Sequence, residues 1–369
     1  MSELKVDKVS PRSGNYVALN TVGMKNIVIN GDMSIAQRST SVASITVDGY
    51  YTCDRWNVGI DSFGTWTQSQ SSDVPSGYGF ATSLKMDCTT AQASPASSSV
   101  ILLEQKFEGQ NLQYLKYGTA NAEQVTLSFW HKHTKTGTNI VELLDADNSD
   151  AVSGSYTQSV SNTWEQATIT FPAKTSGALD NNNAVSLRLR FIMGSGTDNT
   201  SGTLATTWVD TIVNADRYVG QVNNADSTSN DFIITGVQLE AGTTASDFEF
   251  LPYDVNLDRC LRYCWKHGGE IANQYLHGQG GYNDANYLAF GLVSPPVPMR
   301  TTPSLTENGD VIVHRLNTDY TGWTWGFGTG SCLQSWWLQG NKTSHGVTAA
   351  SSVVKCATTS DFILYSSEL

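Results

Sequence analysis

The tryptophans of the C-terminal third are the residues best suited to bind a ligand by surface contact. Trp323, Trp325, Trp336 and Trp337 fall close together, although the chain of 369 residues holds only 10 tryptophans. An aromatic face can stack on the apolar face of a pyranose ring, and tryptophan is enriched where binding energy concentrates. Alternation along a strand places Trp336 and Trp337 on opposite faces. The cluster therefore predicts a glycan site, or an aromatic core or trimer interface, with at least one ring in the core.

Carboxylates in the first half of the chain offer acid–base chemistry. The four candidates are Glu104, Glu108, Asp145 and Asp147. A glycosidase needs two carboxylates at a set separation in space, which the sequence does not show. The chain has neither a G-x-S-x-G nucleophile motif nor a glycine loop that would cradle phosphate. We therefore predict no enzymatic activity and no cofactor.

Two short motifs could hold a metal ion. His131 and His133 share a strand face and could supply two zinc ligands, but no suitable third ligand lies nearby. Asn30-Gly31-Asp32 offers far fewer oxygens than the six to eight that calcium takes. A tight turn with Gly31 at positive φ explains the same residues. We predict no metal site.

The composition favours a β-protein. Charged residues make up 15% of the chain, so it lacks the Glu and Lys that long surface helices carry. The net charge is −12 without any Lys/Arg cluster, which argues against nucleic acid and an anionic membrane surface as partners. No segment has the apolar core of a signal peptide or a membrane span, so we expect synthesis in a bacterial cytoplasm and reduced, buried cysteines.

The apolar pattern divides the chain into four parts. Residues 1–24 contain a strand-like alternation and form an attachment or trimerisation arm, since two short strands cannot bury a core. Residues 25–253 repeat a period of two, as in Val185 to Phe191, which predicts an all-β, antiparallel sandwich. Residues 254–268 carry apolar residues at helical spacing, with Asp254 as the cap. Residues 269–369 form a smaller C-terminal β-domain joined by that short helix.

The two ends of the predicted sandwich resemble a known family. The opening motifs are Asn26-Ile27-Val28-Ile29-Asn30-Gly31-Asp32-Met33, Ile35-Ala36-Gln37-Arg38 and Asp54-Arg55-Trp56. The closing motifs are Gly236-Val237-Gln238-Leu239-Glu240-Ala241-Gly242, Phe248-Glu249, Pro252-Tyr253 and the helix with Cys260, Arg262 and Tyr263. Together they are similar to a module of bacteriophage tail-fibre and appendage proteins over about residues 26–267, although Cys264 stands where that family has a second tyrosine.

The resemblance implies a jelly-roll fold similar to carbohydrate-binding modules, a homotrimer, a place on the virion and no catalytic residues. We expect Trp56 to pack inside the sandwich while Asp54 and Arg55 tie its strand to a loop. The predicted function is a tail fibre that attaches to host-surface glycans, with residues 1–24 docked on other virion proteins. The alternatives are a head fibre or capsid decoration protein and, from another class, a polysaccharide depolymerase.

Overall fold

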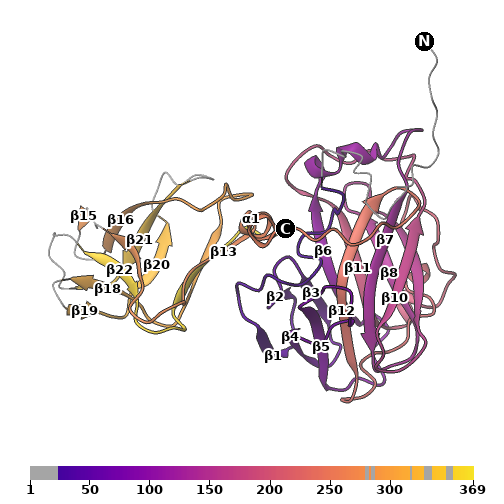
Figure 1. The fold of residues 1–369 in the computed structure, drawn as a ribbon, viewed down its shortest axis with the longest axis horizontal. Helices are drawn as coiled ribbons and strands as arrows, with labels where there is room; N and C mark the ends of the chain where they lie inside the picture. Colours follow the sequence, from indigo (N-terminus) through magenta and orange to yellow (C-terminus); the bar gives the residue numbers. More distant parts are fainter. Residues whose placement is uncertain (1–23, 279–281, 284–286, 316–317, 328–334, 346–351) are drawn as a thin grey trace, which may run out of the picture.

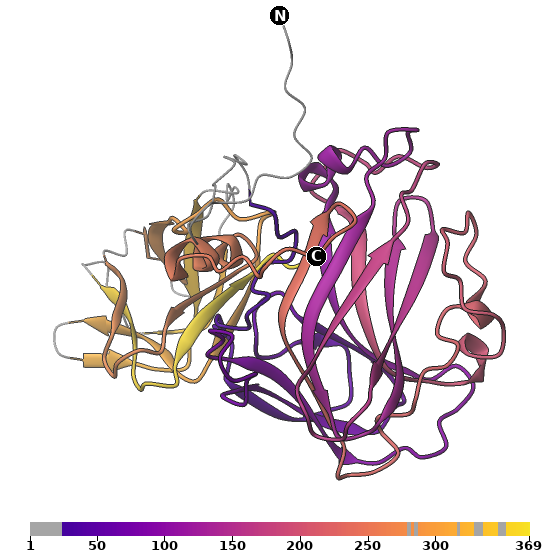
Figure 2. The ribbon, with the colours of Figure 1, turned by 45° about the vertical axis from the view of Figure 1, so that its right-hand side comes forward.

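The computed structural model describes residues 24–278, 282–283, 287–315, 318–327, 335–345 and 352–369. Figure 1 shows two β-rich bodies with the helix α1 (Tyr253–Leu261) between them. Figure 2, from a second direction, shows the long strands of the larger body and the shorter strands of the C-terminal body. The arm predicted at residues 1–24 lies outside the described residues except for Met24. None of the described helices is long and apolar enough to cross a membrane.

The larger body is a sandwich of two six-stranded antiparallel sheets. One, called here the β12 sheet, has the order β1 (Ser41–Ile45), β4 (Thr65–Ser71), β5 (Ser83–Thr90), β12 (Asp231–Ala241), β7 (Val125–His133), β10 (Glu165–Phe171). The other, the β11 sheet, has the order β2 (Gly49–Tyr50), β3 (Asn57–Asp61), β6 (Val100–Glu108), β11 (Val185–Ser195), β8 (Gly137–Asp145), β9 (Asp150–Gln158). The predicted antiparallel jelly-roll sandwich is confirmed.

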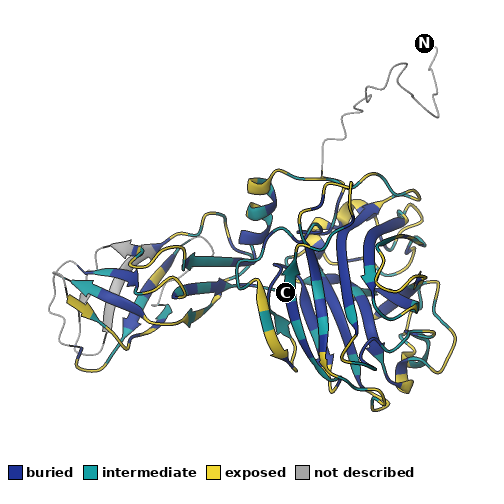
Figure 3. Cartoon of the chain, turned by 60° about the horizontal axis from the view of Figure 1, so that its bottom comes forward, coloured by how far each residue is buried: buried dark blue, intermediate teal, exposed yellow. Residues whose placement is uncertain are grey.

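Alternation along the strands sends one set of side chains between the two sheets. In β11, Leu187, Leu189 and Phe191 are buried in the main core, while Arg188 and Arg190 lie on the outer face. Figure 3 shows the buried residues running along the strands of both sheets. Because neighbouring strands are held in register by backbone hydrogen bonds, side chains on the outer face also form straight rows across the sheet.

The C-terminal body contains three small antiparallel sheets. The first is β13 (Cys264–Gly268), β23 (Phe362–Ser366), β17 (Ser304–Asn308). The second is β14 (Tyr275–Gly278), β22 (Val353–Cys356), β18 (Val311–Arg315), β19 (Thr318–Tyr320). The third is β15 (Tyr282–Asn283), β16 (Tyr287–Val293), β21 (Trp336–Asn341), β20 (Thr324–Phe327). These sheets enclose a second hydrophobic core.

The linking helix is shorter than the predicted 254–268. It covers Tyr253–Leu261, and Asp254 lies in its first turn instead of capping it. Cys264 to Gly268 form β13, whose five residues pair with β23. Helical spacing therefore ends where a long-range strand partner becomes available, because tertiary pairing outweighs local propensity. The other helical elements of the described residues are four short 3-10 turns: η1 (Gly109–Asn111), η2 (Gln113–Leu115), η3 (Thr197–Asn199) and η4 (Asn214–Asp216).

The opening motif adopts an irregular conformation from Asn26 to Ile29, although it lies at the start of residues 25–253, which were predicted to form the strands of the sandwich. Its backbone is held by the Ile27 N–H, which donates to Leu239 O at 2.8 Å, and by the Gln105 side chain, which bonds both backbone groups of Ile29. The residue of this turn that has a positive φ also differs from the prediction, because it is Asn30 (φ 57°) and not Gly31. Gly31 is required because a Cβ there would lie 2.1 Å from Val237 O.

Candidate functional site

Three of the four tryptophans predicted to bind glycan lie in the core of the C-terminal body. Trp323, Trp325 and Trp336 are buried with exposed fractions of 4%, 8% and 0%. Trp336 stacks on Tyr365 with ring centroids 5.0 Å apart. These rings are not presented to solvent, so a surface sugar cannot stack on them. Trp337, on the opposite face of β21, is 42% exposed and is the member of the cluster that can still meet a ligand directly.

The two histidines of β7 are packing residues with neutral hydrogen-bond partners. His131 Nδ1 lies 2.8 Å from Gln158 Oε1, and His133 Nε2 lies 2.9 Å from the Tyr156 hydroxyl. His133 also stacks on Phe232 at 3.9 Å. Burial lowers the pKa of both histidines, which keeps them uncharged at neutral pH. Within the described residues, no group of three or more His, Cys, Asp or Glu side chains is placed to hold a metal ion.

The four predicted carboxylates are dispersed among separate contacts. Glu108 accepts two hydrogen bonds from Arg262 at 2.7 Å and one from the Tyr263 hydroxyl. Asp147 is exposed and accepts from the Asp180 N–H. Glu104 belongs to the outer face of the β11 sheet, described below.

Asp145 helps to enclose a fully buried ammonium group. Lys174 Nζ lies 3.0 Å from Asp145 Oδ2 and 2.7 Å from Asp150 Oδ2. It also donates to the backbone carbonyls of Ser176 and Gly177 at 2.5 and 3.0 Å. Four oxygens around one buried cation form a structural charge site, so Asp145 is committed to the fold.

A row of polar side chains crosses the outer face of the β11 sheet. Its register places Glu104 of β6, Arg190 of β11 and Glu142 of β8 directly opposite one another. Arg190 donates to Glu104 Oε2 at 2.9 Å and to Glu142 Oε2 at 3.3 Å. Opposite charges facing one another across strands stabilise a sheet and fix its side chains. The row therefore provides a rigid polar surface on three central strands.

A groove lies over this row, and we call it the β11 groove. Its volume is about 360 Å³. Glu104, Arg188 and Arg190 line its floor, while the segment after β11 contributes Arg217 and Tyr218 on one side. The opposite rim holds two exposed carboxylates, one of which, Asp48, accepts the Ile60 N–H at 2.6 Å. The other rim carboxylate is Asp61.

Arg217 and Tyr218 join the groove wall to its floor. Arg217 forms a bidentate pair with Glu142, through Nε and Nη2, each at 2.7 Å. The Tyr218 hydroxyl points to the same carboxylate at 3.4 Å, and the ring is buried. The groove is therefore built from strands and locked ion pairs, which is the kind of preorganisation that a binding site requires. Its polar groups suit hydroxyl-rich or charged ligands.

The environment keeps the Glu104 carboxylate ionised. Burial by itself would raise its pKa, but Arg190, Lys106 and Arg188 outweigh that effect and lower it overall. The pKa of Glu108 is lowered in the same way, since Arg262 and Tyr263 overcome its burial. A glycosidase acid needs a raised pKa in order to hold its proton at neutral pH. Neither residue meets that requirement.

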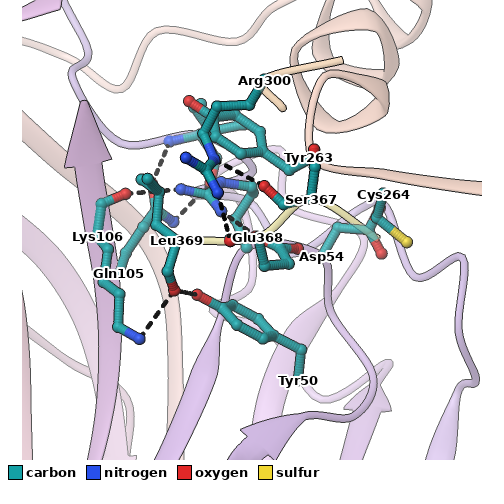
Figure 4. Close-up of polar contacts among 12 residues, drawn as sticks. Tyr50, Asp54, Gln105, Lys106, Tyr263, Cys264, Arg300, Ser367, Glu368 and Leu369 are labelled. Carbon is teal, nitrogen blue, oxygen red and sulfur yellow. Dashed lines mark hydrogen bonds and ion pairs between the residues drawn. The ribbon is translucent and has the colours of Figure 1, made fainter. Parts of the chain in front are cut away.

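The opening motif serves the joint between the two bodies (Figure 4). Trp56 is buried in the sandwich core, as predicted. Arg55 is also buried, lies 3.5 Å from the centroid of the Tyr263 ring and pairs with Glu368 of the C-terminal body. Arg38 reaches Glu368 at 3.2 Å. The opening motif therefore forms part of the contact surface for the C-terminal body, a role that the local sequence does not reveal.

Neighbouring contacts complete the joint. Arg300 of the C-terminal body donates to the Asn183 O of the sandwich at 3.1 Å, and it also holds the backbone carbonyls of Ser367 and Glu368 at 2.7 and 2.9 Å. The Leu369 O accepts from Tyr50 at 3.1 Å and from Lys106 at 2.9 Å. The two bodies are thus connected by buried charge and by backbone hydrogen bonds, in addition to the peptide that links them.

Sequence reasoning missed the residues of the β11 groove. The period of two from Val185 to Phe191 places Arg188 and Arg190 on the face opposite the apolar side chains but assigns them no role. One signal was present, because two arginines alternate on a strand of a chain that has only 22 basic residues. Arg217 could not be found in this way, since it comes from an irregular segment whose path depends on tertiary contacts.

No protein-family model matches the chain, and no curated protein matches it either. Among solved structures, it is similar to the enzymatically active domain of tailspike protein 4 of bacteriophage CBA120, with a TM-score of 0.31 and 16% identity. That match covers 58% of this chain and 21% of the tailspike chain. The matched part of this chain therefore spans about a fifth of that tailspike chain.

Two further matches are complete modules. One is TmCBM61 in complex with β-1,4-galactotriose, with a TM-score of 0.30, 10% identity and coverage of 59% of this chain and 99% of that one. The other is a protein of Bacteroides thetaiotaomicron described as a "putative sugar binding protein", with a TM-score of 0.30, 11% identity and coverage of 59% of this chain and 100% of that one. The strand pairing described above shows the fold of this chain directly.

Proposed function

We propose that this chain is a non-catalytic glycan-binding component of a bacteriophage fibre-type appendage. The observation that carries the binding role is the β11 groove, a polar depression whose floor is fixed by the Glu104–Arg190–Glu142 row. Sugars present many hydroxyl groups, and carboxylate and guanidinium groups held in place can bind them without first losing conformational freedom. The outer face of a jelly-roll sheet is a rigid place for such a site.

The appendage role rests on the opening and closing motifs. The structure brings them together, since Asn26 Nδ2 donates to Val237 O at 3.0 Å and Asn26 Oδ1 accepts the Leu239 N–H. The opening motif also contacts the C-terminal body, since Arg38 lies 3.2 Å from Glu368. We propose a homotrimer whose residues 1–24 dock on other virion proteins, so that several weak sites act together with increased avidity.

The proposal that the component is not an enzyme is supported by its carboxylates. Glu104 and Glu108 are ionised and bound to arginines, so neither can serve as a general acid. Incubation of purified protein with bacterial capsular polysaccharide, followed by size-exclusion chromatography, tests this point. A shortened polymer would overturn it in favour of a depolymerase.

The binding role is tested with a panel of defined neutral and acidic oligosaccharides. Asn214→Trp places a bulky ring at the exposed groove rim and should abolish binding, whereas Trp337→Ala should bind as the unchanged protein does. Circular dichroism confirms that both variants are folded. The opposite pattern would move the site to the C-terminal body, and no binding by the unchanged protein would refute the proposed function. Electron microscopy of the virion separates a tail fibre from a head fibre.

A further inference from the structure

Among the described residues, the β11 groove contains one arginine, Arg188, that donates no hydrogen bond to a carboxylate. Arg190 and Arg217 both donate hydrogen bonds to carboxylates. Arg188 lies 3.8 Å from its nearest carboxylate oxygen, Glu104 Oε2, which is too far for a hydrogen bond. Its buried Nε also lacks a hydrogen-bond partner among the described residues. The guanidinium of Arg188 therefore has N–H donors that form no hydrogen bond with the other described residues.

The strand register places a second cation beside Arg188. Arg188 stands directly opposite Lys106 on β6 and opposite Leu144 on β8. Like charges that face one another across a strand pair destabilise the sheet. Lys106 turns toward Glu104 Oε1 at 3.3 Å, so the one carboxylate within reach already serves Arg190 and Lys106.

The positive charges of the groove lie on its floor and one side. Among the lining residues, three arginines balance three carboxylates, so the lining as a whole is neutral: Arg188, Arg190 and Arg217 against Glu104, Asp48 and Asp61. Asp48 and Asp61 are exposed on the rim, where solvent screens their charge.

We propose that the β11 groove binds an acidic sugar, with its carboxylate held by Arg188. This rests on the proposed glycan-binding function and names the class of glycan. A planar guanidinium matches a planar carboxylate through two parallel hydrogen bonds, and such charge-assisted pairs are the strong ones. Arg188 is 30% exposed, so its donors are accessible from the groove while its stem stays packed.

The aromatic content of the groove supports an ionic and not a stacking mode of recognition. Tyr218 is the aromatic residue that lines it, and the ring is only 2% exposed. A neutral sugar that depends on stacking would find little ring surface there. The acidic group therefore supplies most of the selectivity, while the amides and hydroxyls of the rim, such as Asn214, suit the sugar hydroxyls.

The test compares two probes that differ only in charge. One is an oligosaccharide that contains glucuronic acid, and the other is the same oligosaccharide after reduction of its carboxyl groups to alcohols. Isothermal titration calorimetry on the full chain should show at least about tenfold tighter binding of the acidic form. Arg188→Gln should reduce that preference to about one, and Arg188→Lys should restore part of it.

A matched control keeps this test specific. Arg315→Gln removes a half-buried arginine of β18, outside the groove, and should leave the preference for the acidic probe intact. Melting temperatures establish that each variant is folded. Equal binding of both probes by the unchanged protein would overturn the acidic-sugar inference while leaving the glycan-binding role. Failure to bind either probe or any oligosaccharide of the wider panel would refute the proposed function itself.

Discussion

Replacement of Glu368 should uncouple the two bodies and lower the stability of the chain. This carboxylate is 6% exposed and faces two arginines, Arg55 (0% exposed) and Arg38 (10% exposed). Removal of one partner of a buried ion pair costs about 3–5 kcal/mol, because the remaining charge stays buried without compensation. Arg55 keeps the carbonyl of Lys106 and the ring of Tyr263. We therefore expect Glu368→Gln to cost about 3 kcal/mol, the lower end of that range.

Urea unfolding followed by tryptophan fluorescence measures this loss. The matched control is Glu123→Gln, which removes a carboxylate from an exposed pair with Lys116. Exposed pairs contribute about 0–1 kcal/mol, so the control should unfold almost as the unchanged chain does. Two separate transitions in Glu368→Gln would show that the bodies have become independent.

A second variant distinguishes buried charge from lost packing. Arg55→Met combined with Glu368→Met removes both charges and retains apolar bulk, so it should be more stable than Glu368→Gln alone. If Glu368→Gln unfolds at the same urea concentration as Glu123→Gln, the joint carries no buried charge and the reasoning fails.

Three further predictions concern other buried groups. Trp336→Ala should cost about 3–5 kcal/mol in a urea titration, because its ring fills the C-terminal core, whereas the exposed Trp337→Ala should cost far less; equal losses would contradict this. Lys174→Met leaves two buried carboxylates uncompensated and should cost about 3–5 kcal/mol, with partial recovery in millimolar Ca²⁺; an unchanged urea midpoint would show that the ammonium is dispensable. Burial lowers the pKa of His267 to about 4, so the unfolded chain binds more protons between about pH 6.5 and pH 4 and stability falls as the pH drops through that window. His267→Gln should reduce the loss between pH 7 and pH 5, and an equal loss in both proteins would refute this assignment.

The sequence was sufficient to predict the sandwich, because several of its strands carry their apolar residues at a period of two. Leu187, Leu189 and Phe191 illustrate the rule, since each faces the core as alternation requires. The expectation of strand structure failed for Asn26 to Ile29, which bond to the Gln105 side chain and, through Ile27 and the Asn26 side chain, to β12. A local pattern contains no information about such distant partners.

The candidate site was harder to predict than the fold. The clustering of the tryptophans indicated Trp336 as a candidate binding residue, but a large apolar ring suits a hydrophobic core equally well. Arg188 became informative only once the register placed Lys106 opposite it and Glu104 beyond hydrogen-bond distance. Whether Arg188 has a hydrogen-bond partner depends on how distant residues are arranged in three dimensions, and one sequence does not show that arrangement.

The joint also has a consequence for the order of events during synthesis. Arg55 and Glu368 are separated by 313 positions. At about 5–20 residues per second, the ribosome needs about 15–60 s to pass from one to the other. Until the segment after β23 that carries Glu368 has been synthesised, a folded sandwich would leave Arg55 without its carboxylate partner. A chain truncated before Glu368 would keep Arg55 in that state, so the joint between the two bodies forms only after Glu368 has been added.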